Sequence, residues 1–252
     1  MLELKNICAC YGKTEILHGT SISFSKGKHI SIIGPNGSGK STLLKTAVGI
    51  LPVVSGDITA DGDNIANLSR RQLAQKVAYL SQGKNVPDMT VRQLVLHGRF
   101  PHLNYPRRYT ENDRNIVISA LNQLGISSLA DRPLSSLSGG MRQNAYIAMA
   151  LSQDADYILL DEPTSYLDIS HQLELMKTLK MLAHLGKGIV TVIHDLPLAF
   201  SFSDSIAVMK DGAIIAEGAP CEIYSQPIIQ DVFGVELDYL EKEKSYCYKY
   251  NI

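Results

Sequence analysis

The chain of 252 residues predicts an α/β fold: a mixed, mainly parallel sheet with an N-terminal antiparallel β subdomain and an inserted α-helical subdomain. An apolar run at 29–33 leads through a glycine-rich loop into a helix-like run at 43–48. Two more strand-like runs, 157–160 and 188–193, flank a helical pattern, which implies a parallel crossover. The first 30 residues alternate between apolar and polar, as antiparallel strands do.

Local signals place the elements up to residue 80. We expect the helix after the glycine-rich loop to run to about Ile50. Residues 56–62 read as a turn between two short strands, because Gly and Asp favour tight turns. Ser69 is placed to cap a helix, since its hydroxyl can accept a bond from a first-turn N–H. Residues 77–80 then form a short apolar run, which predicts a buried strand.

The middle of the chain is helical in pattern. Thr90 and Thr110 each precede a helix-like run, and acidic residues follow Thr110 in the first turn. The stretch 101–108 is proline-rich, basic and irregular, and a further helix is expected over 170–186. We therefore expect a single domain over 1–252, with a core of about 1–85 and 154–235, a helical subdomain of about 86–153 and a C-terminal tail of 236–252.

Composition is that of an ordinary soluble globular protein, with 45% hydrophobic and 19% charged residues. The net charge of -1 gives no electrostatic reason to expect nucleic acid as a partner. No apolar run approaches the ~20 residues that cross a bilayer, and no secretory signal is visible. The cysteines lack zinc or disulfide spacing, and we interpret Cys8 and Cys10 as small buried or edge residues of a strand. These features indicate the cytoplasm.

The glycine-rich loop predicts a phosphate site. Its spacing is G-x-x-x-x-G-K-S, between a strand and a helix, and its backbone N–H groups and the helix N-terminus can cradle an anion. Lys40 can reach the outer phosphates of a nucleotide, Ser41 can offer its hydroxyl to Mg²⁺, and Thr42 can reach the inner phosphates. The alternative is a tight turn with a surface lysine. The candidate nucleotide-binding residues are Gly34, Pro35, Asn36, Gly37, Ser38, Gly39, Lys40, Ser41 and Thr42.

Three other strand ends carry polar groups that suit the same chemistry. Asp161 and Glu162 follow an apolar strand, so Asp161 can hold Mg²⁺ while Glu162 can polarise an attacking water. Gln82 can coordinate the metal or orient water, and His194 can donate to a γ-phosphate. Each has a structural alternative as an ordinary loop or strand-end residue. Because the strands of Glu162 and His194 should be parallel, both side chains are expected at one edge of the sheet.

Residues 137–143, Leu-Ser-Gly-Gly-Met-Arg-Gln, lie before a helix expected from Asn144 to about Leu151. Ser138 is a natural N-cap, so a simple capped helix is one interpretation. The other is a second anion site made of backbone N–H groups, a hydroxyl and a helix N-terminus. Since the first site already holds one nucleotide's phosphates, this second site is expected to face a nucleotide held by another copy.

Together these motifs resemble the ATP-binding cassette (ABC) ATPases, the nucleotide-binding subunits of ABC transporters, over about residues 2–235. By resemblance, 34–42 is the Walker A loop and 137–143 the signature motif, and the chain binds ATP and Mg²⁺. The resemblance also implies that Gln82 belongs to the Q-loop and that Asp161 and Glu162 end Walker B, with Glu162 as the catalytic base. It implies that 165–168 is the D-loop, which includes Asp168. It implies as well that His194 is the switch histidine and that the ring of Tyr11 stacks on adenine. It further implies a head-to-tail dimer, in which Ser138, Gly139, Gly140 and Asp168 reach the partner's nucleotide.

Two positions depart from the family pattern, which usually has Gln where this chain has Met141 and a basic residue where it has Asn144. Both bear on the strength of dimer closure, whereas Ser138 and the two glycines that follow it are kept.

A block of basic and aromatic residues suggests the type of transporter. Residues 98–102, with 106–109, are similar to ATPases of importers for iron–siderophore complexes, haem and vitamin B12. This resemblance implies a separate polytopic permease, an extracytoplasmic substrate-binding protein and a peripheral location on the cytoplasmic side of the inner membrane. A solvated turn is the structural alternative for the block. Other functional alternatives are an exporter ATPase, a soluble ABC ATPase acting on ribosomes or DNA, and a small-molecule kinase.

Overall fold

The computed structural model describes residues 1–81 and 86–249, so Gln82 lies outside the described residues. The strands are β1 (Leu2–Tyr11), β2 (Thr14–Phe24), β3 (His29–Ile33), β4 (Ser55–Ala60), β5 (Asp63–Asn64), β6 (Val77–Leu80), β7 (Tyr157–Asp161), β8 (Gly188–Val192), β9 (Ser205–Lys210), β10 (Ala213–Gly218), β11 (Glu236–Leu240) and β12 (Ser245–Lys249). The α-helices are α1 (Lys40–Ala47), α2 (Arg70–Lys76), α3 (Val91–His97), α4 (Glu111–Gln123), α5 (Gly139–Ser152), α6 (Ile169–His184), α7 (Leu196–Phe202), α8 (Pro220–Tyr224) and α9 (Ile228–Phe233). Short 3₁₀ turns are η1 (Ile65–Asn67), η2 (Phe100–His102), η3 (Ser127–Leu129) and η4 (Leu134–Ser136).

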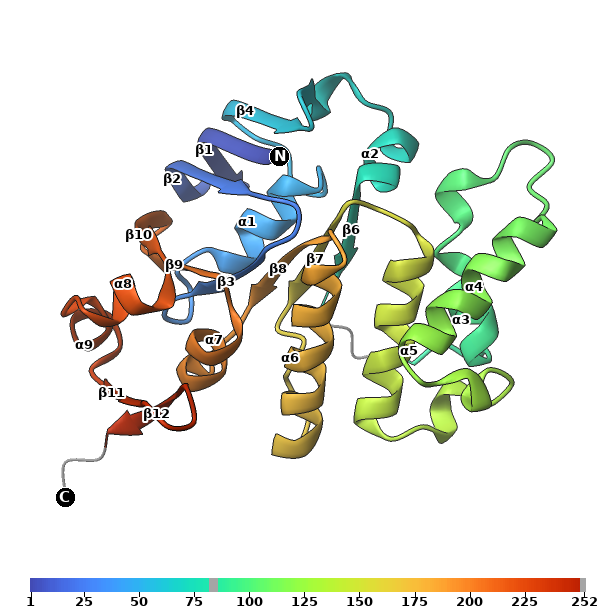
Figure 1. Cartoon of the computed structure of the whole chain (residues 1–252). Coiled ribbons are helices and arrows are strands. Elements are labelled where there is room, and N and C mark those ends of the chain that lie inside the picture. The colour runs from blue at the N-terminus through green and yellow to red at the C-terminus, as the bar shows by residue number, and fades with distance from the viewer. Residues whose placement is uncertain (82–85, 250–252) are drawn as a thin grey trace.

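A six-stranded sheet in the order β10-β9-β3-β8-β7-β6 forms the centre of the molecule. All neighbours in it are parallel except β10 and β9, which confirms the predicted mixed, mainly parallel sheet. Every residue of β3, β7 and β8 is buried, as expected for strands covered on both faces. Figure 1 shows α1 on one face of this sheet and α6 and α7 on the other. Because β7 and β8 are parallel neighbours, their carboxyl ends lie side by side at the same end of the strands.

The N-terminal strands form a second sheet, which is antiparallel as predicted, and its strand order is β2-β1-β4-β5. Its inner face packs over α1, through residues such as Leu4, Phe24 and Leu43, to make a hydrophobic core. The helix α1 ends at Ala47, three residues before the predicted Ile50, because Gly49 adopts a left-handed backbone with φ of 67°. This packing fixes α1 and the loop before it against the sheet.

The helices α3, α4 and α5 lie together beyond the β6 edge of the central sheet (Figure 1). The helices α3 and α4 begin directly after Thr90 and Thr110, as predicted, and in the structure each start is a capping box. Ser138 caps α5 as predicted, but the helix starts at Gly139 rather than Asn144 because the two glycines already have helical backbone. The expected irregular stretch after residue 100 begins with the 3₁₀ turn η2. A buried ion pair, Arg99 Nε to Asp113 Oδ1 at 2.9 Å, ties this turn to α4.

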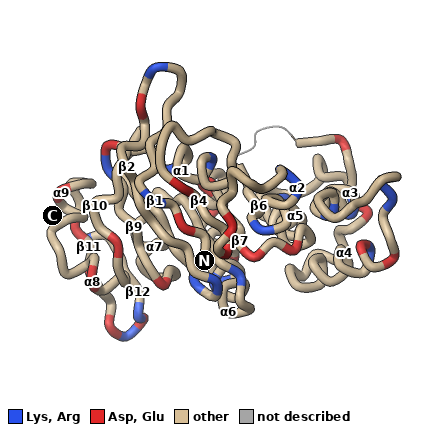
Figure 2. Tube along the Cα trace, turned by 90° about the horizontal axis from the view of Figure 1, so that it is seen from above, with Lys and Arg blue, Asp and Glu red and all other residues tan. Residues whose placement is uncertain are grey.

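The C-terminal part, for which we predicted no elements, continues from α8 and α9 into the antiparallel hairpin β11–β12 beside α7 (Figure 1). Charges of both signs are interspersed along the trace rather than segregated (Figure 2). Within the described ranges, no helix has both the length and the apolarity to cross a bilayer. The cysteines are free thiols, and Cys8 and Cys10 are half-buried on β1.

Candidate functional site

The glycine-rich loop joins β3 to α1 by a backbone path that two glycines make possible. Gly39 precedes α1 with φ of 99°, a left-handed conformation that a side chain disfavours. Gly34 passes so close to the carbonyl oxygen of Met209 on β9 that any Cβ there would collide with it. The loop therefore lies against the sheet, with its N–H groups at the start of α1.

Lys40 is buried at the first turn of α1, with 6% of its surface exposed. Its Nζ donates to the carbonyl oxygens of Gly34 and Pro35, each at 2.8 Å. Burial lowers the pKa of Lys40, although the nearby charges of Glu162 and Asp161 oppose this shift. Beside it, the buried Ser38 hydroxyl has no hydrogen-bond partner among the described residues, which leaves a donor in the loop for a bound anion.

A cavity of about 260 Å³ opens over this loop. Its lining joins residues of the loop to two side chains from the ends of β7 and β8, Glu162 and His194. The predicted meeting of these two side chains at one sheet edge is thus confirmed. Among the loop residues that line it are Asn36, Gly37, Gly39, Lys40, Ser41 and Thr42.

Asp161, at the end of β7, accepts two hydrogen bonds. Ser41 Oγ donates to its Oδ1 at 2.7 Å, and Tyr79 OH donates to its Oδ2 at 3.1 Å. Burial and the charge of Asp161 raise the pKa of Tyr79, so its hydroxyl stays protonated and keeps donating. Sequence reasoning missed Tyr79, and its place inside the β6 strand pattern gives no signal that could have found it.

Glu162 contacts His194 directly, with 2.6 Å between Glu162 Oε1 and His194 Nε2. Ser165 Oγ donates to the other carboxylate oxygen at 3.1 Å. Burial alone would raise the pKa of Glu162, but the bonds from His194 and Ser165 and the charge of Lys40 lower it overall. Glu162 also has φ of 52°, a left-handed backbone conformation that is uncommon for a non-glycine residue.

The donors around Asp161 suit a magnesium ion. The described residues contain no group of three or more His, Cys, Asp or Glu side chains that could hold a metal by themselves. Ser41 and Asp161 instead bring one hydroxyl and one carboxylate together beside the phosphate loop. Mg²⁺ is usually bound in this way, by one or two protein oxygens together with substrate phosphates.

Residues 138–140 lie elsewhere and do not line the cavity over the loop. Ser138 Oγ accepts from Met141 N at 3.3 Å, and Gly140 packs so closely on the His171 ring that a Cβ would collide with it. Asp168 caps α6 and accepts from both His171 N and Nδ1, and these bonds help to lower its pKa to about 2. The signature-like turn and the start of α6 thus form one packed unit.

Two other candidates are placed less completely. Tyr11 ends β1 with 47% of its surface exposed and does not line the cavity over the loop. A second cavity of about 430 Å³, lined by residues such as Tyr79, Asp161 and Tyr146, opens between α5 and the end of β7. Because Gln82 is outside the described residues, its role in binding the metal or orienting water stays a prediction.

A phosphate loop, a strand-end acid pair and a facing histidine define a P-loop nucleotide-hydrolysing protein. Comparison with known proteins makes this specific: the family model for ABC transporters matches residues 17–165. The chain belongs to the ABC transporter family and is one of its ATP-hydrolysing subunits.

Curated relatives match over nearly the whole chain. The petrobactin import ATP-binding protein FpuD of Bacillus anthracis is 41% identical, covering 93% of this chain and 87% of its own length. The iron(3+)-hydroxamate import ATP-binding protein FhuC of Bacillus subtilis is 40% identical, covering 96% and 92%.

Solved structures agree in fold. An ATP-binding cassette of an ABC transporter in its ADP conformation superposes with a TM-score of 0.83 at 28% identity, covering 92% of this chain and 98% of that one. The dimeric structure of a bacterial ABC transporter cassette gives 0.74 at 28% identity, covering 87% and 99%.

Proposed function

We propose that this chain powers an importer of an iron–siderophore complex or a related metal chelate, such as haem or vitamin B12. The observation that carries the proposal is the contact of Glu162 with His194 above the phosphate loop, in a chain about 40% identical to siderophore importer subunits. A separate polytopic permease, served by an extracytoplasmic substrate-binding protein, moves the cargo. The ATPase sits peripherally on the cytoplasmic side of the inner membrane.

In the nucleotide site, residues 34–42 hold the phosphates of ATP and Tyr11 stacks on adenine. Lys40 carries the positive charge of the loop, and the partnerless Ser38 hydroxyl supports an anion there. Ser41, Asp161 and Gln82 hold Mg²⁺. The ion supplies positive charge that neutralises the phosphate oxygens.

For hydrolysis, Glu162 orients and polarises the attacking water, and His194 donates a hydrogen bond to the γ-phosphate as charge develops. The contacts that lower the pKa of Glu162 keep it ionised and therefore able to accept a proton. Phosphoryl transfer depends mainly on such positioning and charge neutralisation, so the residues that hold Glu162, including Ser165, matter as much as its basicity.

Each working site belongs to two copies of the chain. The Walker A loop of one copy and Ser138, Gly139, Gly140 and Asp168 of the other enclose one ATP, so that two sites form with closed two-fold symmetry. This is supported by the absence of 138–140 from the lining of the loop cavity and by the dimeric cassette of similar fold. ATP favours the closed dimer, and hydrolysis removes the γ-phosphate contacts that hold it together.

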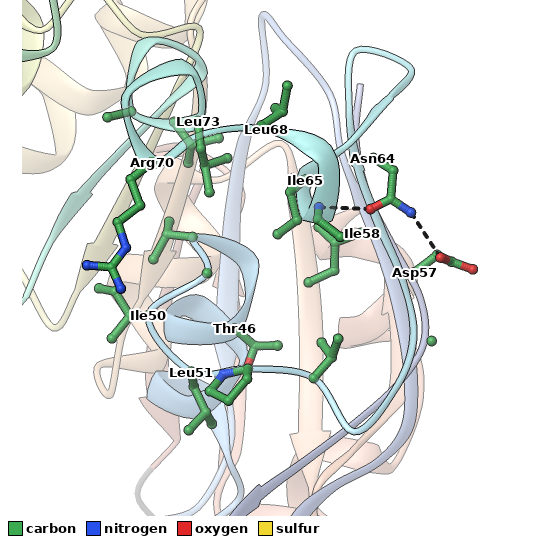
Figure 3. A pocket seen from close by; sticks show the side chains of 18 residues that line it. Thr46, Ile50, Leu51, Asp57, Ile58, Asn64, Ile65, Leu68, Arg70 and Leu73 are labelled. Atoms are coloured by element: carbon green, nitrogen blue, oxygen red, sulfur yellow. Dashed lines mark hydrogen bonds between the residues drawn. The ribbon is translucent and has the colours of Figure 1, made fainter.

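A surface around α2 suits the membrane partner. On one side of α2, an apolar cavity of about 640 Å³ lies between the end of α1 and β4, with Ile50 and Leu51 beneath Leu73 (Figure 3). On the other side, Arg71 and Gln75 donate to the carbonyl oxygen of Pro101, each at 2.8 Å. The basic and aromatic block of 98–102 and 106–109 is thus joined through Pro101 to α2, which also borders the cavity. In this proposal the cavity and the block together bind a cytoplasmic helix of the permease.

Uptake of ⁵⁵Fe-loaded siderophores, haem and cobalamin by whole cells tests this function. An Ile50→Asp variant places a charge at an exposed position of the cavity lining, and a carboxylate left unpaired beneath the permease helix costs several kcal/mol of binding free energy. We expect uptake of one substrate class to fall at least about tenfold, while ATP hydrolysis by the isolated subunit stays within about twofold, since a 1.4 kcal/mol loss is already tenfold.

Ile215→Asp is the matched control, because Ile215 is also an exposed isoleucine but lies on β10, away from the cavity. Its uptake should equal that of the wild type. If a Glu162→Gln strain takes up every substrate in the panel normally, the chain does not power metal-chelate import, and an exporter becomes the better assignment.

A further inference from the structure

The C-terminal hairpin β11–β12 pairs with no other strand in the described part of the chain. An isolated two-stranded hairpin is only marginally stable in water, so packing must hold this one in place. Its second strand, β12, lies against α7, the helix that follows directly after His194 (Figure 1). The hairpin therefore packs against α7, the helix that begins two residues after His194 of the nucleotide site.

Aromatic packing anchors the hairpin. The ring of Tyr246 on β12 meets Phe200 of α7 edge-on, with 5.2 Å between ring centroids. Tyr224 of α8 and Tyr239 of β11 pack on the same ring at 5.3 and 4.9 Å. Tyr246 N also donates to Ser201 Oγ of α7 at 3.0 Å. One end of α7 is thus fixed to β12.

The other end of α7 is held by Tyr248. Leu196, the first residue of α7, donates its backbone N–H to Tyr248 OH at 3.3 Å. The first four N–H groups of a helix have no partner within the helix, so this hydroxyl serves as an additional cap. Asp195 caps the same turn by accepting from Leu198 N at 2.9 Å.

Hydrogen bonds hold the backbone on both sides of His194. On one side, Ile193 N donates to Ile32 O at 3.2 Å and holds the chain to the central sheet. On the other side, Asp195 and Tyr248 hold the first turn of α7. The direction of the imidazole, which contacts Glu162 at 2.6 Å, depends on the backbone between these hydrogen bonds.

We propose that Tyr248 is a positioning residue for His194, and that the C-terminal hairpin orients this histidine for ATP hydrolysis. The proposal rests on the proposed function of His194, because it assigns the hairpin a role in the same reaction. In this proposal the hairpin, which lies in the C-terminal tail, affects the rate of ATP hydrolysis and does not affect nucleotide binding.

Tyr248→Phe tests this with the whole chain, because it removes one hydroxyl and keeps the ring. We expect kcat for ATP to fall about three- to tenfold, the range for one lost hydrogen bond, with KM unchanged within about twofold. In a His194→Ala background the same substitution should cause no further loss. Tyr239→Phe, which removes a hydroxyl elsewhere in the hairpin, is the control and should keep wild-type kcat.

A second readout does not need hydrolysis. In nucleotide-free protein with ¹³C-labelled histidine, Tyr248→Phe should shift the His194 ring resonance, assigned through His194→Ala, and Tyr239→Phe should not. An unmoved His194 resonance, or an equal loss of kcat in the His194→Ala background, would overturn the role of Tyr248. Should the wild type fail to hydrolyse ATP, the proposed function fails, while the resonance still reports on the contact.

Discussion

Glu162→Gln is expected to abolish nearly all ATP turnover while leaving ATP binding intact. The substitution keeps the shape of the side chain and its place beside His194 and Ser165, but removes the carboxylate that polarises water. General base catalysis contributes about 10²- to 10⁴-fold, so kcat should fall by that factor. Phosphate release under steady-state conditions and ATP affinity by equilibrium titration measure the two effects separately.

Glu174→Gln is a suitable control, since Glu174 is an exposed carboxylate on α6 that does not line the loop cavity. It should hydrolyse ATP at the wild-type rate. Normal turnover in Glu162→Gln itself would refute the assignment of Glu162 as the base.

Lys40→Ala is expected to lose most ATP binding. The buried ammonium is held at the loop by two carbonyl oxygens and carries the loop's positive charge toward the cavity. A charged hydrogen bond is worth about 1.5–3 kcal/mol, so the Kd for ATP should rise about 10- to 150-fold. Titration with a fluorescent ATP analogue measures this change.

Lys45→Ala, in the last turn of the same helix and outside the cavity lining, should bind ATP like the wild type. An unchanged Kd in Lys40→Ala would remove Lys40 from the phosphate site.

Much of the site could be predicted because its parts lie in short local patterns. The loop spacing identifies Lys40 and Ser41, and the parallel arrangement of two apolar strands brings Glu162 and His194 to one edge. Helix starts were predictable for the same reason, since a capping residue such as Ser69 acts within three residues of itself.

The remaining features depend on contacts between distant segments. Tyr79 reaches Asp161 only because β6 and β7 pair, and no feature of its own strand marks its hydroxyl. His171 packs on Gly140 through the contact of α6 with α5, and Tyr248 reaches Leu196 through tertiary packing of the hairpin. Helix ends were also missed, as at Ala47, because propensity alone does not locate a left-handed glycine.

The shared nucleotide site is tested most directly by the mass of the Glu162→Gln protein in ATP, measured by analytical ultracentrifugation with nucleotide quantified in the same sample. We expect a dimer that holds two ATP molecules, and we expect a second substitution, Ser138→Arg, to keep the protein monomeric at unchanged ATP affinity. A protein that stays monomeric in ATP while the wild type hydrolyses at full rate, or a dimer indifferent to Ser138→Arg, would contradict a site built from two chains.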